Sequence, residues 1–223
     1  MSNQPKVDAP SYKEKLGTLL EQLSEMLPAE ALETFNRDAD QLAKNHKSPI
    51  KLSPGDKAPS FSLPNAIDNS ISLKEVLAEG PVVLTFYRGT WCPYCNLALK
   101  TYQQILPQIK QAGASLVAIS PQTPDNSLNM KEKNNLEFEV LSDVGNEVAR
   151  QYTTVFKNGI EPIEAMNEMD IDFYSFYSDD SGEIPVPATF VINQDGTIGF
   201  ARSEGGDYRK RVEPEAILKA LES

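Results

Sequence analysis

Cysteine, histidine and tryptophan are scarce in this chain of 223 residues. Two cysteines occur, Cys92 and Cys95, together with one histidine, His46, and one tryptophan, Trp91. Both cysteines lie in one short motif, so no disulfide framework connects distant parts of the fold. A structural zinc site needs four ligands, and the few cysteine and histidine side chains argue against one. We therefore expect neither a metal nor another cofactor.

Basic residues and long apolar runs are also few. The 21 Lys and Arg against 32 Asp and Glu give a net charge of −11, and the one basic cluster of note, residues 209–211, is followed by Glu213 and Glu215. This cluster is too small to bind a phosphate backbone, so nucleic acid is not expected as a partner. The longest apolar stretch, residues 81–87, is far shorter than the ~20 residues of a membrane helix. Residues 1–15 contain no apolar run of the signal-peptide type, so we expect a cytoplasmic protein.

The N-terminal part of the chain, residues 12–44, has apolar residues at helical spacing. Pro28 interrupts the pattern, and Pro is favoured in the first turn of a helix, so we predict two short helices meeting near Leu27. The apolar stripe of this hairpin needs a cover, and two remain open: the rest of the chain, or a second copy in a homodimer. A linker at residues 45–57 marks the best boundary, with the hairpin and linker in residues 1–50 and the main domain in residues 51–223.

The main domain alternates strand-like and helix-like segments, which is typical of an α/β fold. Pro107 should kink the helix that follows the first buried strand, and the turn at residues 193–196 predicts a hairpin. Residues 161–183 carry eight acidic residues and no Lys or Arg, and we interpret them as an irregular surface insertion partly fixed by its aromatic side chains. The expected strands are residues 82–87, 115–120, 136–141, 188–192 and 197–200, and the expected helices are residues 92–111, 126–134, 146–156 and 213–221.

The chemistry is expected in the motif formed by residues 90–95, Thr-Trp-Cys-Pro-Tyr-Cys. Two cysteines three positions apart, where a buried strand turns into a helix, can form a reversible disulfide with little backbone movement. The free amides and the dipole of the helix N-terminus should lower the pKa of at least one thiol below the ~8.5 of free cysteine. The alternative, that both cysteines are only small buried apolar residues, is disfavoured by this placement.

The motif and the strand before it, residues 83–95, resemble the active-site strand and helix of thioredoxin-fold proteins. More closely, they resemble the alkyl hydroperoxide reductase and thiol-specific antioxidant family, the peroxiredoxins. Residues 55–63 are similar to that family's entry strand, and residues 188–196 are similar to its late hairpin. The resemblance extends from about Leu52 onward. It implies a thioredoxin-like α/β fold, with a central mixed sheet flanked by helices and here an N-terminal helical extension.

Three positions depart from the family pattern. Counted from the strand, Cys95 falls at the position of the peroxidatic cysteine, whereas Cys92 replaces the family's Thr and Arg88 its Pro. The family's Arg before the late hairpin would align with Pro187 and is absent. Pro187 instead resembles the cis-proline of thioredoxins.

Two redox mechanisms follow from the resemblance. In the first, the Cys95 thiolate attacks a hydroperoxide and Cys92 resolves the sulfenic acid to a disulfide, which thioredoxin or a similar dithiol reductant restores. In the second, Cys92 attacks a protein disulfide and Cys95 resolves the mixed disulfide. A third, non-enzymatic possibility is a redox sensor in which the dithiol switches a partner bound by the helical hairpin. We favour the first, a thioredoxin-dependent peroxidase.

Several neighbours of the cysteines are candidate substrate-binding residues. Arg88 can supply positive charge and Thr90 a hydrogen-bond donor to the departing oxygen, with a solvated strand-end charge as the alternative for Arg88. Trp91 and Tyr94 can line a substrate groove or simply pack. Pro187 completes the set by its resemblance to the thioredoxin proline.

Overall fold

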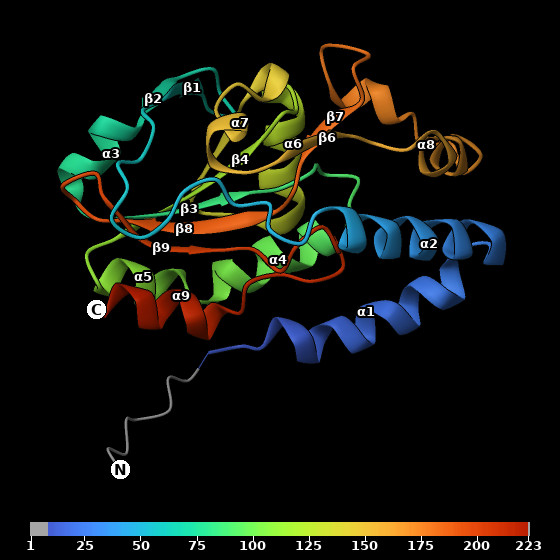
Figure 1. The fold of residues 1–223 in the computed structure, drawn as a ribbon, viewed down its shortest axis with the longest axis horizontal. Coiled ribbons are helices and arrows are strands. Elements are labelled where there is room, and N and C mark those ends of the chain that lie inside the picture. Colours follow the sequence, from blue (N-terminus) through green and yellow to red (C-terminus); the bar gives the residue numbers. More distant parts are fainter. Residues whose placement is uncertain (1–8, 223) are drawn as a thin grey trace.

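A mixed β-sheet of five strands lies at the centre of the computed structural model, which describes residues 9–222 (Figure 1). Residues 1–8, part of the polar N-terminal segment, and residue 223 lie outside the described residues. The strand order is β5-β4-β3-β8-β9; β3, β4 and β5 are parallel, and β8 and β9 complete the sheet in antiparallel fashion. The strands are β3 Val82–Phe86, β4 Ser115–Ser120, β5 Glu139–Ser142, β8 Ala188–Ile192 and β9 Ile198–Arg202.

Helices cover both faces of this sheet, which explains why β3 is an unbroken apolar run with every residue buried. Val83 points to the face that carries α4 Pro93–Gln104, α5 Leu106–Gln111 and α9 Pro214–Leu221. Leu84 points to the opposite face, against α3 Leu73–Glu79 and α7 Ala149–Tyr152. Helix α6 Pro124–Asn134 packs against α4 and β5. The predicted central mixed sheet flanked by helices is thus confirmed.

Two small antiparallel sheets and one further helix lie outside this centre. Strands β1 Ser62–Pro64 and β2 Ser70–Ser72 form one pair, and β6 Val155–Lys157 and β7 Glu183–Pro185 form the other. Between β6 and β7 the chain forms α8 Ile160–Asn167 and a 3₁₀ turn at Phe173–Phe176. Another 3₁₀ turn lies at Val144–Asn146.

The N-terminal helices are α1 Tyr12–Met26 and α2 Ala29–Asn45, separated at Pro28 as predicted. Helix α1 packs against α4, and α2 packs against α8. Tyr12 and Leu23 of α1 are buried in the same core cluster as the sheet and α4. The apolar stripe of the hairpin is therefore covered by the chain's own core. Within residues 9–222, no helix has both the length and the apolar character that crossing a bilayer requires.

The local elements with clear turn signals were predicted correctly. The helix after β3 breaks at Ile105, next to Pro107, because Pro lacks an N–H and its ring collides with the carbonyl four residues earlier. The hairpin of β8 and β9 turns at residues 193–196, where Gly196 has a φ of 81°.

Two predicted segments were wrong. Residues 146–156 do not form one helix: only Ala149–Tyr152 is helical, because Gly145 and Asn146 have positive φ and β6 begins at Val155. Residues 161–183 are not irregular throughout, since they include most of α8. The buried Ile163, Met166 and Phe173 form a small core cluster, which a surface insertion would lack. The expected aromatic anchoring is confirmed, because Phe173 contacts Trp91, Tyr174 and Tyr177.

The expectation of a cis-proline at Pro187 was also wrong. Every peptide bond within the described residues is trans. Val186 is held in an extended path between β7 and β8, because its N–H donates to Thr154 O and its carbonyl accepts from the Thr153 hydroxyl. Pro187 continues this path into β8.

The carboxylate of Glu213 is predicted to anchor the start of α1. It accepts the backbone N–H groups of Tyr12 and Lys13, each at 2.9 Å, two of the four N–H groups that a helix start leaves unpaired. Glu213→Ala should lower the free energy of unfolding by about 1 kcal/mol, the usual effect of losing a cap and a favourable charge at the helix dipole. Urea denaturation measures this, with the exposed Glu25 of α1 as the control in Glu25→Ala. Equal effects of the two variants would contradict the assignment.

Candidate active site

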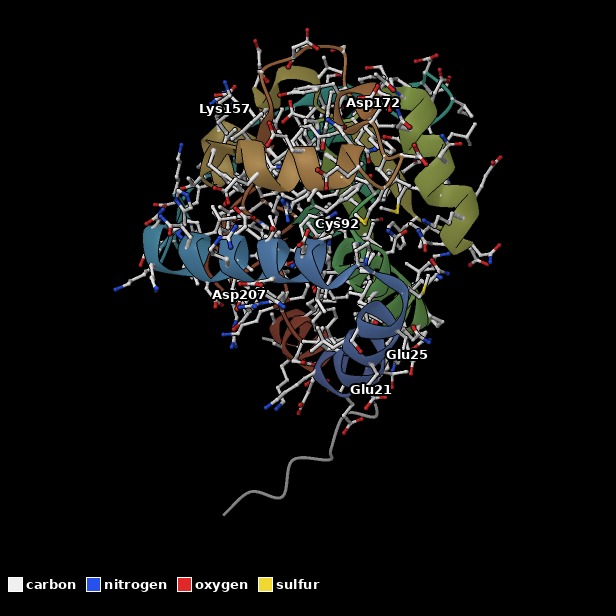
Figure 2. All side chains as sticks on the ribbon, turned by 90° about the vertical axis from the view of Figure 1, so that its right-hand side faces the viewer. Glu21, Glu25, Cys92, Lys157, Asp172 and Asp207 are labelled. Atoms are coloured by element: carbon white, nitrogen blue, oxygen red, sulfur yellow. The ribbon has the colours of Figure 1, made fainter. Side chains whose placement is uncertain are left out.

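The two cysteines lie at the corner where β3 turns into α4. Cys92 is the N-cap of α4, Pro93 occupies the first turn with its preset φ, and Cys95 lies one turn further along. Both cysteines are free and both are buried, with 1% of Cys92 and 0% of Cys95 exposed. Helices α2 and α8 flank Cys92 from either side in Figure 2.

The sulfur of Cys95 contacts a buried arginine. Arg211 precedes α9, and its Nη2 donates to Cys95 Sγ at 3.1 Å. Burial raises the pKa of the Cys95 thiol, but this effect is outweighed by the hydrogen bond from Cys92, the charge of Arg211, and the backbone N–H and charge of Arg88. The pKa of Cys95 is consequently well below its usual range, which favours the thiolate form of this residue.

Cys92 has the opposite protonation state. Burial, followed by its hydrogen bond to Cys95 and the negative charge there, raises the pKa of Cys92 well above its usual range, and Arg88 and Arg211 oppose this only in part. The two opposite shifts in pKa favour a thiolate at Cys95 and a thiol at Cys92. The lowered pKa of Cys95 agrees in direction with the prediction of one acidic thiol, but its causes are Cys92, Arg211 and Arg88 rather than the start of the helix.

A cavity of about 210 Å³ lies over Cys92. Its walls are mostly apolar and come from α1, α2, α8 and the residues after α8, whereas its polar side chains gather near the cysteine. Cys92 lines the cavity and Cys95 does not. The lining residues are Leu23, Leu27, Leu32, Phe35, Arg88, Trp91, Cys92, Pro93, Tyr94, Asn158, Pro162, Met166, Met169, Ile171 and Tyr208.

Arg88 is buried beside this cavity rather than solvated at a strand end. Its guanidinium lies 4.7 Å from the ring centre of Trp91 and 4.0 Å from that of Tyr208, distances typical of cation–π contacts. Its Nη2 donates to Asn158 Oδ1 at 3.2 Å. Burial raises the pKa of Asp38 on α2, and the positive charge of Arg88 counteracts this, so Asp38 is the nearby opposite charge.

Thr90 and Pro187 do not reach the cavity. The Thr90 hydroxyl lies 3.1 Å from Gln122 Oε1 and 3.0 Å from the Asn126 carbonyl, and the Thr90 N–H donates to Gln122 at 2.8 Å. These bonds fix the turn before α4 and engage the single hydroxyl proton. Pro187 is buried, and its carbonyl accepts from Ser203.

Trp91 and Tyr94 both line the cavity, and their neighbours fix them. The Trp91 Nε1–H donates to the Tyr177 hydroxyl at 2.8 Å, and that hydroxyl donates in turn to the Arg88 carbonyl at 3.0 Å. The Tyr94 ring lies 5.9 Å from that of Tyr208. The segment after α8 thereby holds the indole beside the cysteines.

Three residues of the site were missed in the sequence. Arg211 belongs to the basic cluster at residues 209–211, but no sequence pattern places that cluster beside the cysteines. Asn158 and Tyr208 are distant from the cysteine motif and carry no local signal. Within residues 9–222, no group of three or more His, Cys, Asp or Glu side chains could hold a metal ion.

Comparisons with known proteins agree with the geometry. The model of the AhpC/TSA family matches residues 54–201. A protein of Mycobacterium tuberculosis designated a peroxiredoxin is 28% identical over 69% of this chain and 95% of its own length. The thiol-disulfide oxidoreductase ResA of Bacillus cereus is 26% identical over 74% of this chain and 81% of its own. The crystal structure of peroxidoxin BcpB from M. tuberculosis superposes with a TM-score of 0.59 at 24% identity, covering 77% of this chain and 97% of that one, which confirms the thioredoxin-like fold.

The contact with Arg211 is predicted to control the pKa of Cys95. Arg211→Met removes the nearest positive charge, so the pKa of Cys95 should rise toward the ~8.5 of a free thiol. In a pH titration followed by the ultraviolet absorbance of the thiolate, the wild type should show a step below the pKa of a free thiol. Arg211→Met should lack this step. Arg211→Lys retains a charge and should give an intermediate value.

Arg202 provides the matched control, because its side chain is half exposed on β9 and pairs with Glu204. Arg202→Met should leave the thiolate titration unchanged. If Arg211→Met also left it unchanged in a folded protein, Arg211 would not be the source of the acidity.

Proposed function

This chain belongs to the AhpC/TSA family, and we propose that it is a thiol peroxidase that reduces hydroperoxides through a dithiol–disulfide cycle of Cys95 and Cys92. The observation that carries the proposal is the contact of Arg211 Nη2 with Cys95 Sγ at 3.1 Å. It supports a thiolate at the position of the family's peroxidatic cysteine. Pro187 replaces the family's usual Arg in this chain. Arg211 is therefore the residue that supplies positive charge to Cys95.

In the first step, the Cys95 thiolate attacks the terminal oxygen of the hydroperoxide. A sulfur–oxygen bond forms, the O–O bond breaks, and Cys95 becomes a sulfenic acid. The departing alkoxide takes the proton of Cys92, which is a thiol at neutral pH, and leaves as an alcohol. Cys92 thereby supplies the proton from the position where the family has a Thr.

In the second step, the Cys92 thiolate attacks the sulfenic sulfur of Cys95. The disulfide forms, and the hydroxide that leaves becomes water by taking a solvent proton. The two thiols have then lost two electrons, which reduce the peroxide to alcohol and water. A dithiol reductant such as thioredoxin restores both thiols by disulfide exchange.

The reacting oxygen enters through the cavity and passes Cys92. Cys92 lines the cavity, whereas the fully buried Cys95 does not. Arg88 lines the cavity beside the cysteines and supplies positive charge that favours the developing alkoxide. Thr90 acts indirectly, by fixing the turn through Gln122.

A thiol-disulfide oxidoreductase is the second candidate, because Cys92 is the sulfur that faces the cavity. In that reaction Cys92 would attack first as a thiolate. Its raised pKa disfavours this order, because only the thiolate is an effective nucleophile. Reduction of insulin disulfides without turnover of hydroperoxide would favour this candidate.

The cycle suits a reducing compartment, so the cytoplasm is the proposed location. Reductants there keep thiols reduced and can recycle the disulfide. A homodimer through the N-terminal helices stays a prediction. Leu20 and Met26 of α1 are exposed apolar side chains that such a dimer would cover.

The two cysteines are predicted to have different roles under peroxide. Cys92→Ser should still form a sulfenic acid at Cys95, which accumulates because no resolving thiol is present and which dimedone traps for mass spectrometry. Cys95→Ser should react no faster than a free thiol, since it lacks the thiolate held by Arg211. The wild type should consume hydroperoxide in a coupled assay with thioredoxin and its reductase.

The reverse pattern would assign the first attack to Cys92. A wild-type protein that forms no disulfide with either hydrogen peroxide or an organic hydroperoxide would contradict the proposed function. Mass spectrometry of the oxidised protein identifies the Cys92–Cys95 disulfide directly.

A further inference from the structure

We infer that the cavity over Cys92 binds the organic group of a bulky, uncharged hydroperoxide, and that the N-terminal helices form the part of it that selects this substrate over hydrogen peroxide. The inference rests on the proposed function, because it names the substrate class of the same site. It assigns a role to helices that lie outside the part of the chain matched by the family model, residues 54–201.

The N-terminal helices contribute one apolar wall of the cavity, and the region of α8 contributes the other. Neither wall presents a charged side chain to the cavity. The first wall consists of Leu23, Leu27, Leu32 and Phe35, and the second of Pro162, Met166, Met169 and Ile171. Such a surface gains free energy only by covering an apolar group, which hydrogen peroxide does not have.

The size of the cavity fits an aryl or branched alkyl group. Its volume of about 210 Å³ exceeds the roughly 150 Å³ of an apolar protein cavity that binds benzene. Cumene hydroperoxide, a phenyl ring with a short branched carbon that carries the peroxide, is therefore a suitable probe. Without such a ligand, water would occupy a cavity whose apolar walls offer it few hydrogen bonds.

The polar end of the cavity fits the peroxide group. Arg88 and Asn158 are 2% and 4% exposed and both line the cavity. Arg88 Nε and Asn158 Nδ2 are buried, and neither has a hydrogen-bond partner within residues 9–222. Buried N–H groups without partners are costly, and oxygen atoms of a bound hydroperoxide would satisfy them. The donors lie beside Cys92, so the apolar group is directed toward the two walls.

The apolar walls favour an uncharged substrate. Neither wall offers a partner to a charged organic group, and a charge that is buried without a partner is costly. The substrate class is therefore an apolar hydroperoxide without a charge near the peroxide group.

Trp91 allows a direct test, because it is the single tryptophan of the chain and lines the cavity. Its fluorescence should report oxidation of the adjacent dithiol in a single turnover, without any reductant. We expect the reduced protein to react with cumene hydroperoxide about 10-fold or more faster than with hydrogen peroxide, the range over which an apolar pocket discriminates.

Leu27 and Leu20 form a matched pair of test positions. Leu27, at the end of α1, is half-buried and lines the cavity, whereas Leu20, on the same helix, is exposed and does not. Leu27→Ser should lower the ratio of the rate with cumene hydroperoxide to the rate with hydrogen peroxide about fivefold or more. Leu20→Ser should change neither rate.

The cumene alcohol product, 2-phenyl-2-propanol, tests binding independently of the redox step. It should change Trp91 fluorescence in the wild type and bind about fivefold or more weakly to Leu27→Ser. Equal wild-type rates with both hydroperoxides, or equal losses in Leu27→Ser, would overturn the inference while leaving the peroxidase function intact. Loss of the proposed function is distinguishable, because then neither hydroperoxide would oxidise the dithiol, whether or not the alcohol binds.

Discussion

The contact between Arg211 and Cys95 is the interaction on which the site depends. A guanidinium that is removed from solvent requires a compensating anion, and the Cys95 thiolate is that anion. Arg211 also donates to the carbonyls of Tyr208 and Lys210, so its position is fixed before any substrate arrives. The neighbouring Cys92 remains protonated because burial raises its pKa, and its hydrogen bond to Cys95 and the negative charge there raise it further. One buried cation thus defines which sulfur attacks and which one supplies a proton.

The N-terminal helices belong to this arrangement rather than to a separate attachment. The Tyr12 hydroxyl donates to the Arg209 carbonyl at 2.7 Å, and Glu213 binds the start of α1, so α1 is tied to both sides of the segment that carries Arg211. From there α1 and α2 extend over Cys92 and form an apolar wall of the cavity. The same helices therefore bury the dithiol and shape the path by which a hydroperoxide reaches it.

Much of the fold could be predicted from the sequence because its signals are local. The buried run of β3, the break at Pro107 and the turn at Gly196 depend on neighbours in the chain, and the cysteines lie close together because they are three positions apart. The contact of Arg211 with Cys95 joins residues 116 positions apart, and no periodicity indicates it. The burial of Cys92 likewise depends on α2 and α8, which are distant from it in the sequence.

The central claim is that Cys95, and not Cys92, is the thiolate of the reduced protein. Site-resolved NMR titration of the cysteine Cβ chemical shifts measures this directly, because each sulfur is followed separately. The account predicts that Cys95 is ionised at neutral pH and that Cys92 loses its proton only above the range of a free thiol. Ionisation of Cys92 at lower pH than Cys95 would contradict it.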